Sequence, residues 1–328
     1  NRVAITADFY HKKTNDLLLN APIPTTSGFG FAVMNIGNIE NHGFDFDIRT
    51  ENIKGEFSWN TAINVSINRN KITNLNSEND IPLMGGLILR QGLSVGAFYG
   101  YVFDGIFQTD AEAASSPVLV GQEPTGPNPA SHAKAGDRKY KDLNGDKKID
   151  VNDREIIGYA TPKFTWGFSN NFSYRNWSLA VFFQGSQGNK MANLNNLDLL
   201  NFNGQTNLMA EAALNRWTPT NPSNKYPRAL AAGSLDNGLI STNIVEDASY
   251  IRLKNIQLGY EFSTRLLKKM HLKRLRLYAS ATNLFTITDY SGFDPEANAF
   301  GQSTTLMGLD LGGYPQAKTF LFGINLGL

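Results

Sequence analysis

The sequence predicts an all-β protein made of antiparallel transmembrane β-barrel strands with long extracellular loops. Three observations lead to this prediction. Several segments alternate between apolar and polar side chains over about ten residues, which is typical of a strand with one apolar face. No segment approaches the roughly 18 consecutive apolar residues of a transmembrane helix. Long and short connections also alternate along the chain.

Two segments show the alternation most clearly. Residues 319–328 carry one apolar face, with small or polar residues behind it. Taken alone, this segment suits a half-buried strand of a soluble sandwich as well as a membrane strand. Residues 56–68 place Ser and Asn opposite a longer apolar face, which suits lipid on one side and a wet lumen on the other. That apolar face consists of Phe57, Trp59, Thr61, Ile63, Val65 and Ile67.

Six further segments are expected to be strands: 2–19, 43–50, 164–174, 177–184, 250–262 and 273–287. Short turns are expected near 51–55, 175–176 and 263–272, and long loops at 20–42, 71–162, 185–245 and 288–316. Within the long loops we expect a hairpin of 87–90 with 95–107 and a short helix at 208–217. Because long and short connections alternate, all long loops lie at one end of the strands. Outer-membrane barrels have this arrangement, with long extracellular loops and short periplasmic turns.

Composition excludes several classes of function. The chain has 30 Lys and Arg against 29 Asp and Glu, so no charge excess directs it to nucleic acid. It has no cysteine and only four scattered histidines, and no nucleophile–base pair or phosphate-binding loop is present. No catalytic residue is therefore predicted, and no substrate-binding residue is named. The mean hydropathy of −0.29 is compatible with a barrel, because lumen-facing residues dilute the average.

One segment has the spacing of an EF-hand-type calcium loop. Side-chain oxygens at loop positions 1, 3, 5, 9 and 12, with a backbone carbonyl at position 7, supply the oxygen ligands that Ca²⁺ requires. The predicted ligands are Asp142, Asn144, Asp146, Lys148 (through its carbonyl), Asp150 and Asp153. Such an ion would be structural and would stiffen the loop 108–162.

Two features of this loop depart from the EF-hand pattern. Lys147 replaces the glycine of position 6, and Asp153 is shorter than the usual bidentate Glu. Ile149 matches the usual apolar anchor at position 8. The alternative is a solvated acidic turn, in which Asp and Asn side chains accept hydrogen bonds from their own backbone.

Charged and aromatic strand residues offer weaker candidates. Asp45, Asp47 and Arg49 lie on the expected inner face, where they could touch cargo or, more ordinarily, form a solvated lumen wall. Trp59, Trp166 and Trp177 could stack on sugars. Since they lie on the apolar faces, an interfacial aromatic girdle is the preferred interpretation.

Five stretches together resemble the C-terminal part of the barrel of SusC/RagA-like TonB-dependent outer-membrane transporters of Bacteroidetes. They are NIGNIENHGFDF from Asn35, DLNGDKKIDVNDREIIG from Asp142, YIRLKNIQLGY from Tyr250, ATNLFT from Ala281 and GFDPE from Gly292. The resemblance covers essentially the whole chain. The sequence departs from the family in lacking the plug domain and TonB box, and in ending on Leu328 where an aromatic residue is usual.

The resemblance implies the C-terminal portion of a 22-stranded barrel in the cell outer membrane, surrounded by outer-membrane lipid. It implies import of oligosaccharides or peptides, driven through TonB with a SusD-like surface lipoprotein as partner. An open sheet edge in lipid leaves backbone groups unpaired. Either the eight strands close on themselves or further strands complete the sheet, and we expect the chain to be part of a longer protein. Two alternatives stay open: a self-contained small barrel acting as anchor or adhesin, and a soluble β-sandwich carbohydrate-binding module.

Overall fold

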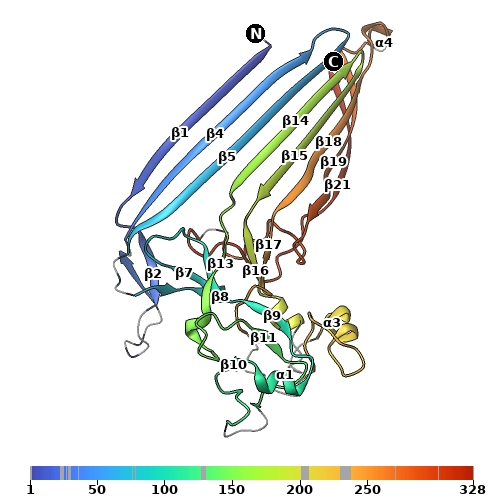
Figure 1. The fold of residues 1–328 in the computed structure, drawn as a ribbon. Helices are drawn as coiled ribbons and strands as arrows, with labels where there is room; N and C mark the ends of the chain where they lie inside the picture. Colours follow the sequence, from blue (N-terminus) through green and yellow to red (C-terminus); the bar gives the residue numbers. More distant parts are fainter. Residues whose placement is uncertain are drawn as a thin grey trace.

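Eight long strands form one antiparallel sheet, which confirms the eight predicted strands (Figure 1). The structure is a computed structural model. It describes residues 2–22, 26, 28, 31–35, 37–75, 77, 79–126, 131–200, 207–229, 238–269, 271–301 and 303–327. In spatial order the strands are β1 (Val3–Thr14), β4 (Gly37–Ile53), β5 (Phe57–Leu75), β14 (Phe164–Tyr174), β15 (Trp177–Gln187), β18 (Tyr250–Glu261), β19 (Arg274–Thr288) and β21 (Thr319–Gly327).

The register of the sheet brings the apolar halves of all strands onto one face. Along one row, Ile5 lies opposite Ile48, Ile48 opposite Ile63, Ile63 opposite Phe168, and Phe168 opposite Phe183. Successive strand residues point to opposite faces, so the residues between these form a second face of Ser, Asn, Asp and other polar side chains. The sheet therefore has one apolar face and one polar face across all eight strands.

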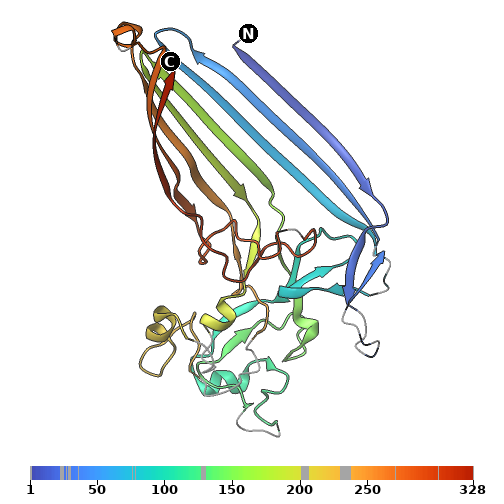
Figure 2. The same ribbon diagram turned by 180° about the vertical axis from the view of Figure 1, so that it is seen from behind.

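The connections confirm the predicted alternation of lengths. The turns β4–β5 and β14–β15, the turn that carries α4 (Thr264–Lys269), and both termini lie at one end of the sheet (Figures 1 and 2). The long connections gather at the opposite end. Strand order along the sheet is strand order along the chain, so each connection joins immediate neighbours.

Several boundaries differ from the prediction. β5 continues to Leu75, so the first long excursion spans 76–163 rather than 71–162, and β15 continues to Gln187. The predicted strand 2–19 ends at Thr14, and the hairpin of β2 (Leu18–Pro22) with β3 (Phe31–Asn35) starts before the predicted loop 20–42 and continues into it; β4 also begins within that loop. The extension of β4 and β5 mixes polar pairs, such as Glu40 with Lys71, with the apolar pair of Ile39 and Ile72. Alternation of polarity could not reveal it, because Ile72 falls out of the period of two that the apolar residues of 57–67 follow.

Short strands and helices fill the first long connection. Its elements are β6 (Ile81–Pro82), a 3₁₀ turn at Met84–Gly86, β7 (Leu87–Leu89), β8 (Ala97–Tyr101), β9 (Phe103–Ile106), α1 (Asp110–Ser115), β10 (Val118–Leu119), β11 (Arg138–Tyr140), β12 (Lys148–Ile149), a 3₁₀ turn at Val151–Asp153 and β13 (Arg154–Tyr159). The pairing of β7 with β8 confirms the predicted hairpin for the first part of 95–107, whereas β9 pairs with β11 instead.

The two later long connections contain fewer elements. The connection from β15 to β18 contains β16 (Lys190–Asn193), α2 (Asn196–Leu199), α3 (Ala210–Asn215) and β17 (Val245–Asp247), and the connection from β19 to β21 contains β20 (Leu309–Asp310). The helix α3 confirms the short helix predicted at 208–217. Residues 127–130, 201–206, 230–237 and the terminal Leu328 belong to predicted segments but lie outside the described residues. No helix in the described part of the chain is long and apolar enough to cross a membrane.

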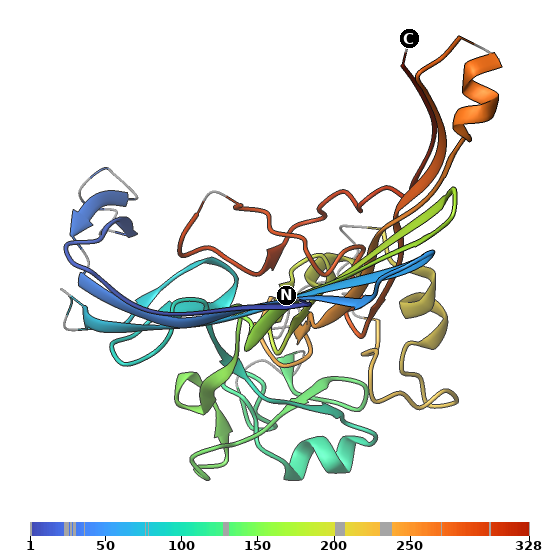
Figure 3. The same cartoon turned by 90° about the horizontal axis from the view of Figure 1, so that it is seen from above.

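The long connections pack on one another around a common core. The main cluster takes residues from three different connections: Leu87, Phe98, Ala192, Leu194, Ile244, Val245 and Leu309. Seen from the short-turn end, the sheet is curved and the segment 289–318 lies on its concave side (Figure 3). β1 and β21 form the two edges, and no pairing between them occurs in the described residues. Within these residues the eight strands do not close on themselves.

Candidate functional site

The polar face of the sheet contains a hollow near the short-turn end. Its volume is about 210 Å³, and polar side chains from five strands line it. Arg276 Nη2 donates a 3.3 Å hydrogen bond to Ser178 Oγ there, and the hydroxyls of Ser58 and Ser173 lie 2.5 Å apart. The hollow provides hydroxyl and amide groups with one cation, and its main polar lining residues are Ser58, Asn60, Asn171, Ser173, Ser178, Gln257 and Arg276.

A buried ion-pair cluster fixes the segment 289–318 on the polar face. The Arg252 side chain is 2% exposed, and its Nη2 lies 2.7 Å from Asp294 Oδ1. Its Nε donates to Thr286 Oγ1 at 2.8 Å, and its Nη1 pairs with Glu296. The Tyr250 hydroxyl donates to Glu296 Oε1 at 2.6 Å. One strand arginine therefore binds both acids of the segment Asp294-Pro-Glu296.

The Asp294 carboxylate also holds its own segment in shape. It accepts hydrogen bonds from the backbone N–H of Glu296 at 2.9 Å and of Gln316 at 3.1 Å. Burial alone would raise the pKa of Asp294, but these N–H groups and the Arg252 guanidinium hold the pKa below its ordinary value. Asp294 is thus ionised at neutral pH and joins the two ends of the segment to the strand β18.

A second anchor lies at Asp310, which is 1% exposed. The Tyr290 hydroxyl donates to Asp310 Oδ2 at 2.7 Å, and Asp310 Oδ1 accepts from the backbone N–H groups of Gly312 and Gly313 at 2.9 and 3.1 Å. Burial, followed by the neighbouring Asp310 carboxylate, raises the pKa of the Tyr290 phenol. The segment 289–318 is therefore held at both ends, while Phe293 and Tyr314 beside the anchors are 75% and 91% exposed.

The predicted calcium loop is a closed set of side-chain-to-backbone hydrogen bonds. Asp142 accepts from Gly145 N at 2.7 Å and Lys147 N at 2.8 Å. Asp153, which is fully buried, accepts from Leu143 N and Asp150 N, both at 2.8 Å. These bonds tie Asp142 and Asp153, the first and last acids of the pattern, to backbone groups of the same loop. The two ends of the loop therefore lie close together.

The side chains in the middle of the loop also accept hydrogen bonds from nearby backbone N–H groups. Asn144 accepts from Asp146 N, and Asp146 accepts from Lys148 N, each at 2.9 Å. Asp150 accepts from Asn152 N at 2.7 Å. Among the described residues, no three His, Cys, Asp or Glu side chains converge on one point as a metal site would require. The bonds agree with the solvated-turn alternative, and calcium binding stays a prediction.

Of the weaker candidates, the acids and Arg49 lie on the polar face as predicted. Arg49 Nε lies 3.0 Å from Asp47, with the arginine side chain 74% exposed, and Asp45 accepts from Ser66. These contacts are exposed or half-buried, and the solvated wall and the contact with cargo both stay predictions for these three residues.

The three tryptophans lie on the apolar face, as predicted. Trp59 Nε1 donates to Asn170 Oδ1 at 2.8 Å, and Thr61 Oγ1 donates to the same oxygen at 2.8 Å. The ring of Trp177 lies 4.8 Å from that of Tyr260. The Trp59 indole N–H and the Thr61 hydroxyl, which lie on the apolar face, therefore both donate to an acceptor within the sheet.

Sequence reasoning missed the Arg252 cluster. Arg252 is an arginine in a buried stretch of a strand, and an acid pair follows 42 residues later in Asp294 and Glu296. Both signals were visible in the resembling stretches YIRLKNIQLGY and GFDPE. The contact between them depends on the long connection folding back over the polar face, which no local pattern predicts.

A curved antiparallel sheet with one apolar and one polar face, long connections at one end and short turns at the other defines the wall of an outer-membrane β-barrel. The family model "TonB dependent receptor-like, beta-barrel" matches residues 1–284. The chain belongs to this family, whose members are outer-membrane proteins and whose class is that of receptors and transporters rather than enzymes. We therefore call the apolar face lipid-facing, the polar face lumen-facing, and the short-turn end periplasmic.

The chain is similar over nearly its whole length to TonB-dependent receptors and to a peptide transporter. It is 37% identical over 340 residues to the TonB-dependent receptor P3 of Formosa agariphila, covering 99% of this chain and 32% of the relative. It is 28% identical to the TonB-dependent receptor SusC of Bacteroides thetaiotaomicron, with coverages of 99% and 30%. The structure of the RagAB peptide transporter matches with a TM-score of 0.78 and 26% identity, covering 100% of this chain and 34% of that one.

The chain spans about a third of the length of the curated relatives that it matches. The similarity to SusC and to RagAB confirms the SusC/RagA-like resemblance, the all-β fold and the location in the outer membrane. The soluble-sandwich alternative is wrong, because the family is a membrane barrel family and the eight long strands form one sheet with a continuous apolar face.

Proposed function

We propose that this chain forms the C-terminal barrel wall and the extracellular loops of a TonB-dependent importer that takes up nutrients across the outer membrane. The observation that carries the proposal is similarity over 99% of the chain to SusC and over 100% to the RagAB peptide transporter. The chain has no enzymatic role in this proposal. Its wall separates lipid from a polar lumen, and its anchored segment 289–318 lines that lumen.

The proposed cargo class is oligosaccharides or peptides. The lumen-facing side offers Ser, Asn and Gln groups, which can donate to and accept from both sugar hydroxyls and peptide amides. The structurally similar RagAB is a transporter of peptides. In the proposal, energy comes through TonB, and a SusD-like surface lipoprotein covers the extracellular end, where the long connections pack into one layer.

Uptake by intact cells tests the proposal. A strain deleted for the protein is compared with the same strain carrying the natural gene, using fluorescently labelled oligosaccharides and peptides of matched size. The proposal expects one cargo class to enter only the complemented strain, and to stop entering when TonB is removed. Uptake that continues without the protein, or without TonB, contradicts it.

The proposed partner is tested separately. Solubilised protein should co-purify with a surface lipoprotein, and a variant in which the α3 region 208–216 is replaced by a Gly-Ser linker of equal length should lose it. A small self-contained barrel would migrate near 36.2 kDa and show the heat shift of a folded barrel at that mass. That result would favour the anchor alternative instead.

We also propose that the loop 142–153 binds Ca²⁺ as a structural ion. Each carboxylate oxygen has capacity for a second partner after it accepts one backbone N–H. Lys147 adopts the left-handed conformation, with φ of 67°, at the position where EF-hand loops carry glycine. Asp142, Asp146, Asp150 and Asp153 would supply the charge that a divalent ion needs.

A further inference from the structure

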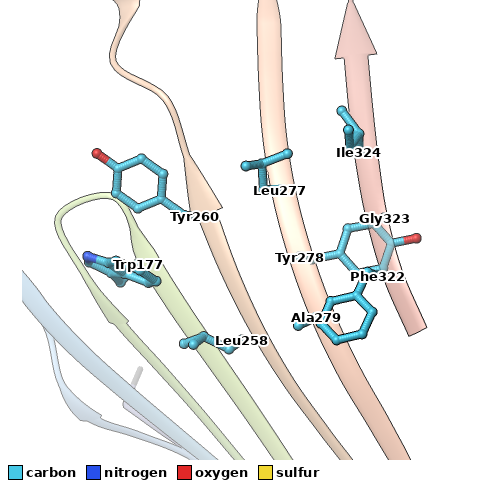
Figure 4. Close-up of a pocket in the computed structure, with 9 residues that line it drawn as sticks. All are labelled: Trp177, Leu258, Tyr260, Leu277, Tyr278, Ala279, Phe322, Gly323 and Ile324. Carbon is cyan, nitrogen blue, oxygen red and sulfur yellow. The ribbon is translucent and has the colours of Figure 1, made fainter. Parts of the chain in front are cut away.

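A hollow of about 580 Å³ lies on the lipid-facing side of the sheet near its periplasmic end (Figure 4). The register explains why it is hollow. Ala279 lies directly between Leu258 on one neighbouring strand and Phe322 on the other, so a small side chain has large ones on both sides. The hollow is apolar, and its lining includes Trp177, Leu258, Tyr260, Leu277, Phe322 and Ile324.

The turn above this hollow is strongly basic. Residues 262–273, here called the α4 turn, join β18 to β19 and contain Arg265, Lys268, Lys269 and Lys273 but no Asp or Glu. The two other short turns carry no comparable excess, since 54–56 has one lysine and one glutamate and 175–176 has one arginine. Among the described residues, none of the four cations of the α4 turn takes part in an ion pair.

The basic turn and the apolar hollow are neighbours on the same hairpin. Tyr260 and Leu277, which line the hollow, are paired across β18 and β19. Arg274 starts β19 only three residues before Leu277, a separation of roughly 10 Å along a strand. Figure 3 places α4 on the opposite side of β19 and β21 from the lumenal segment 289–318. Arg274 itself is paired with Glu261 at 3.2 Å, whereas the α4 turn lies at the same end of the hairpin as the hollow, with Leu266 42% exposed.

We propose that the α4 turn and this hollow bind one anionic phospholipid of the periplasmic leaflet. An acyl chain occupies the hollow over Ala279, and the phosphate lies among the cations of the α4 turn. Lys and Arg near an anionic membrane surface each contribute attraction, and Trp177 and Tyr260 are aromatic residues suited to the interface. The proposal rests on the membrane orientation that the family assignment gives, and not on the cargo.

Native mass spectrometry of the full-length protein tests this site. Delipidated protein in detergent is titrated with phosphatidylglycerol and, separately, with phosphatidylcholine of the same acyl chains. We expect phosphatidylglycerol to bind more tightly. The double variant Lys268→Gln, Lys269→Gln should lower phosphatidylglycerol affinity about 30-fold and phosphatidylcholine affinity much less, because choline neutralises the charge of its phosphate.

A second variant tests the hollow itself. Ala279→Leu fills the space between Leu258 and Phe322, and should lower the affinity for both lipids. Two controls match these changes. Lys54→Gln removes a cation from another periplasmic turn, and Ala7→Leu makes the same enlargement on the lipid-facing side of β1, where the residue is exposed. Both should bind lipid like the natural protein.

Three results would overturn the proposal. Equal affinity for the two lipids would mean ordinary, unselective boundary lipid. Unchanged phosphatidylglycerol affinity in the double lysine variant would remove the α4 turn from the site. An equal loss in Lys54→Gln would mean a general charge effect. Each variant is first shown to keep the heat-modifiable migration of a folded barrel. Cargo uptake is measured independently, so failure here leaves the proposed function standing.

Discussion

The Arg252 guanidinium on a barrel strand and the Asp294 carboxylate on a lumenal segment form an ion pair of 2.7 Å in which both side chains are 5% exposed or less. Removing one partner leaves the other as an uncompensated buried charge, which costs about 3–5 kcal/mol. We expect Arg252→Met to destabilise the protein by this amount in urea unfolding in detergent. Arg49→Met removes an exposed pair on the same face and should cost less than about 1 kcal/mol. Equal losses in the two variants would contradict the role of burial.

The same pair gives a pH dependence. The depressed pKa of Asp294 means that its contribution to stability is fully present above the ordinary value of 3.8 and is lost as the pH falls through the lower, folded value. Glu296 and Lys254 also face the guanidinium region and contribute charge there. Pepsin cleavage within 289–318 should therefore begin only below about pH 3.8. Cleavage of the natural protein well above that pH, at the rate seen for Arg252→Met, would count against the anchor.

The loop 142–153 should bind Ca²⁺, and it should become more stable when the strained backbone conformation at Lys147 is relieved. The left-handed conformation of Lys147 costs a non-glycine residue about 1 kcal/mol. Because the formed loop already adopts this conformation, Lys147→Gly should stabilise the loop itself rather than change its calcium affinity, which isothermal titration measures in both proteins. Ca²⁺ should also slow proteolysis between 108 and 162, and EDTA should reverse the effect. No heat of binding in either protein, with proteolysis unchanged, would leave the solvated turn as the correct interpretation.

A glycine beneath a tyrosine ring makes a fourth test. The side chain of Tyr278 covers Gly323 on the next strand, in the space that a Cβ would occupy. Gly323→Val should destabilise the protein by about 1–3 kcal/mol, since it forces the ring aside. In a Tyr278→Ala background the same substitution should cost much less, and a double-mutant cycle in urea measures the difference. Additive losses would show that the ring and the glycine act independently.

Asn170 should contribute to stability by accepting hydrogen bonds from Trp59 and Thr61 on the lipid-facing side. Asn170→Leu leaves the Trp59 indole N–H and the Thr61 hydroxyl without their acceptor, at a cost of about 1–3 kcal/mol. The triple variant Trp59→Phe, Thr61→Val and Asn170→Leu removes both of these donors and should cost less than Asn170→Leu alone; its remaining cost is the lost acceptor of Asn52 Nδ2, which donates to Thr61 Oγ1 at 2.7 Å. Urea unfolding compares the two. A triple variant less stable than the single one would mean that packing, rather than hydrogen bonding, dominates.

The eight barrel strands could be predicted because lipid imposes the period of two on each of them. In 57–68 every second residue faces the bilayer, so the pattern is local and visible. The pattern is lost in the continuation of β5 to Leu75, where polar pairs such as Glu40 with Lys71 stand beside the apolar pair of Ile39 with Ile72. The short strands of the long connections are less predictable still. β10 and β12 are two residues each and pair in parallel across a separation of about thirty residues, so their partner alone determines them.

The candidate sites also differ in whether a local pattern of the sequence could predict them. The spacing of Asp142 to Asp153 lies within one turn and could be found by counting. The Arg252–Asp294 pair joins two stretches through a fold of the long connection, and the lipid hollow depends on Ala279 having Leu258 and Phe322 as cross-strand neighbours. Both therefore depend on the assembled sheet rather than on any one segment. The alternation of each strand predicts which face a residue occupies, but not which residue lies beside it.

The separation of long connections from short turns has an evolutionary consequence. Insertions and substitutions in 76–163 or 188–249 change the outward surface without shifting the register of any strand, because each connection begins and ends on adjacent strands at the same end of the sheet. A lineage can thus acquire new ligands by remodelling one end of the molecule while the wall is inherited unaltered. The long connections at one end of the eight strands can therefore vary between relatives, while the strands and the short turns at the other end keep their structure.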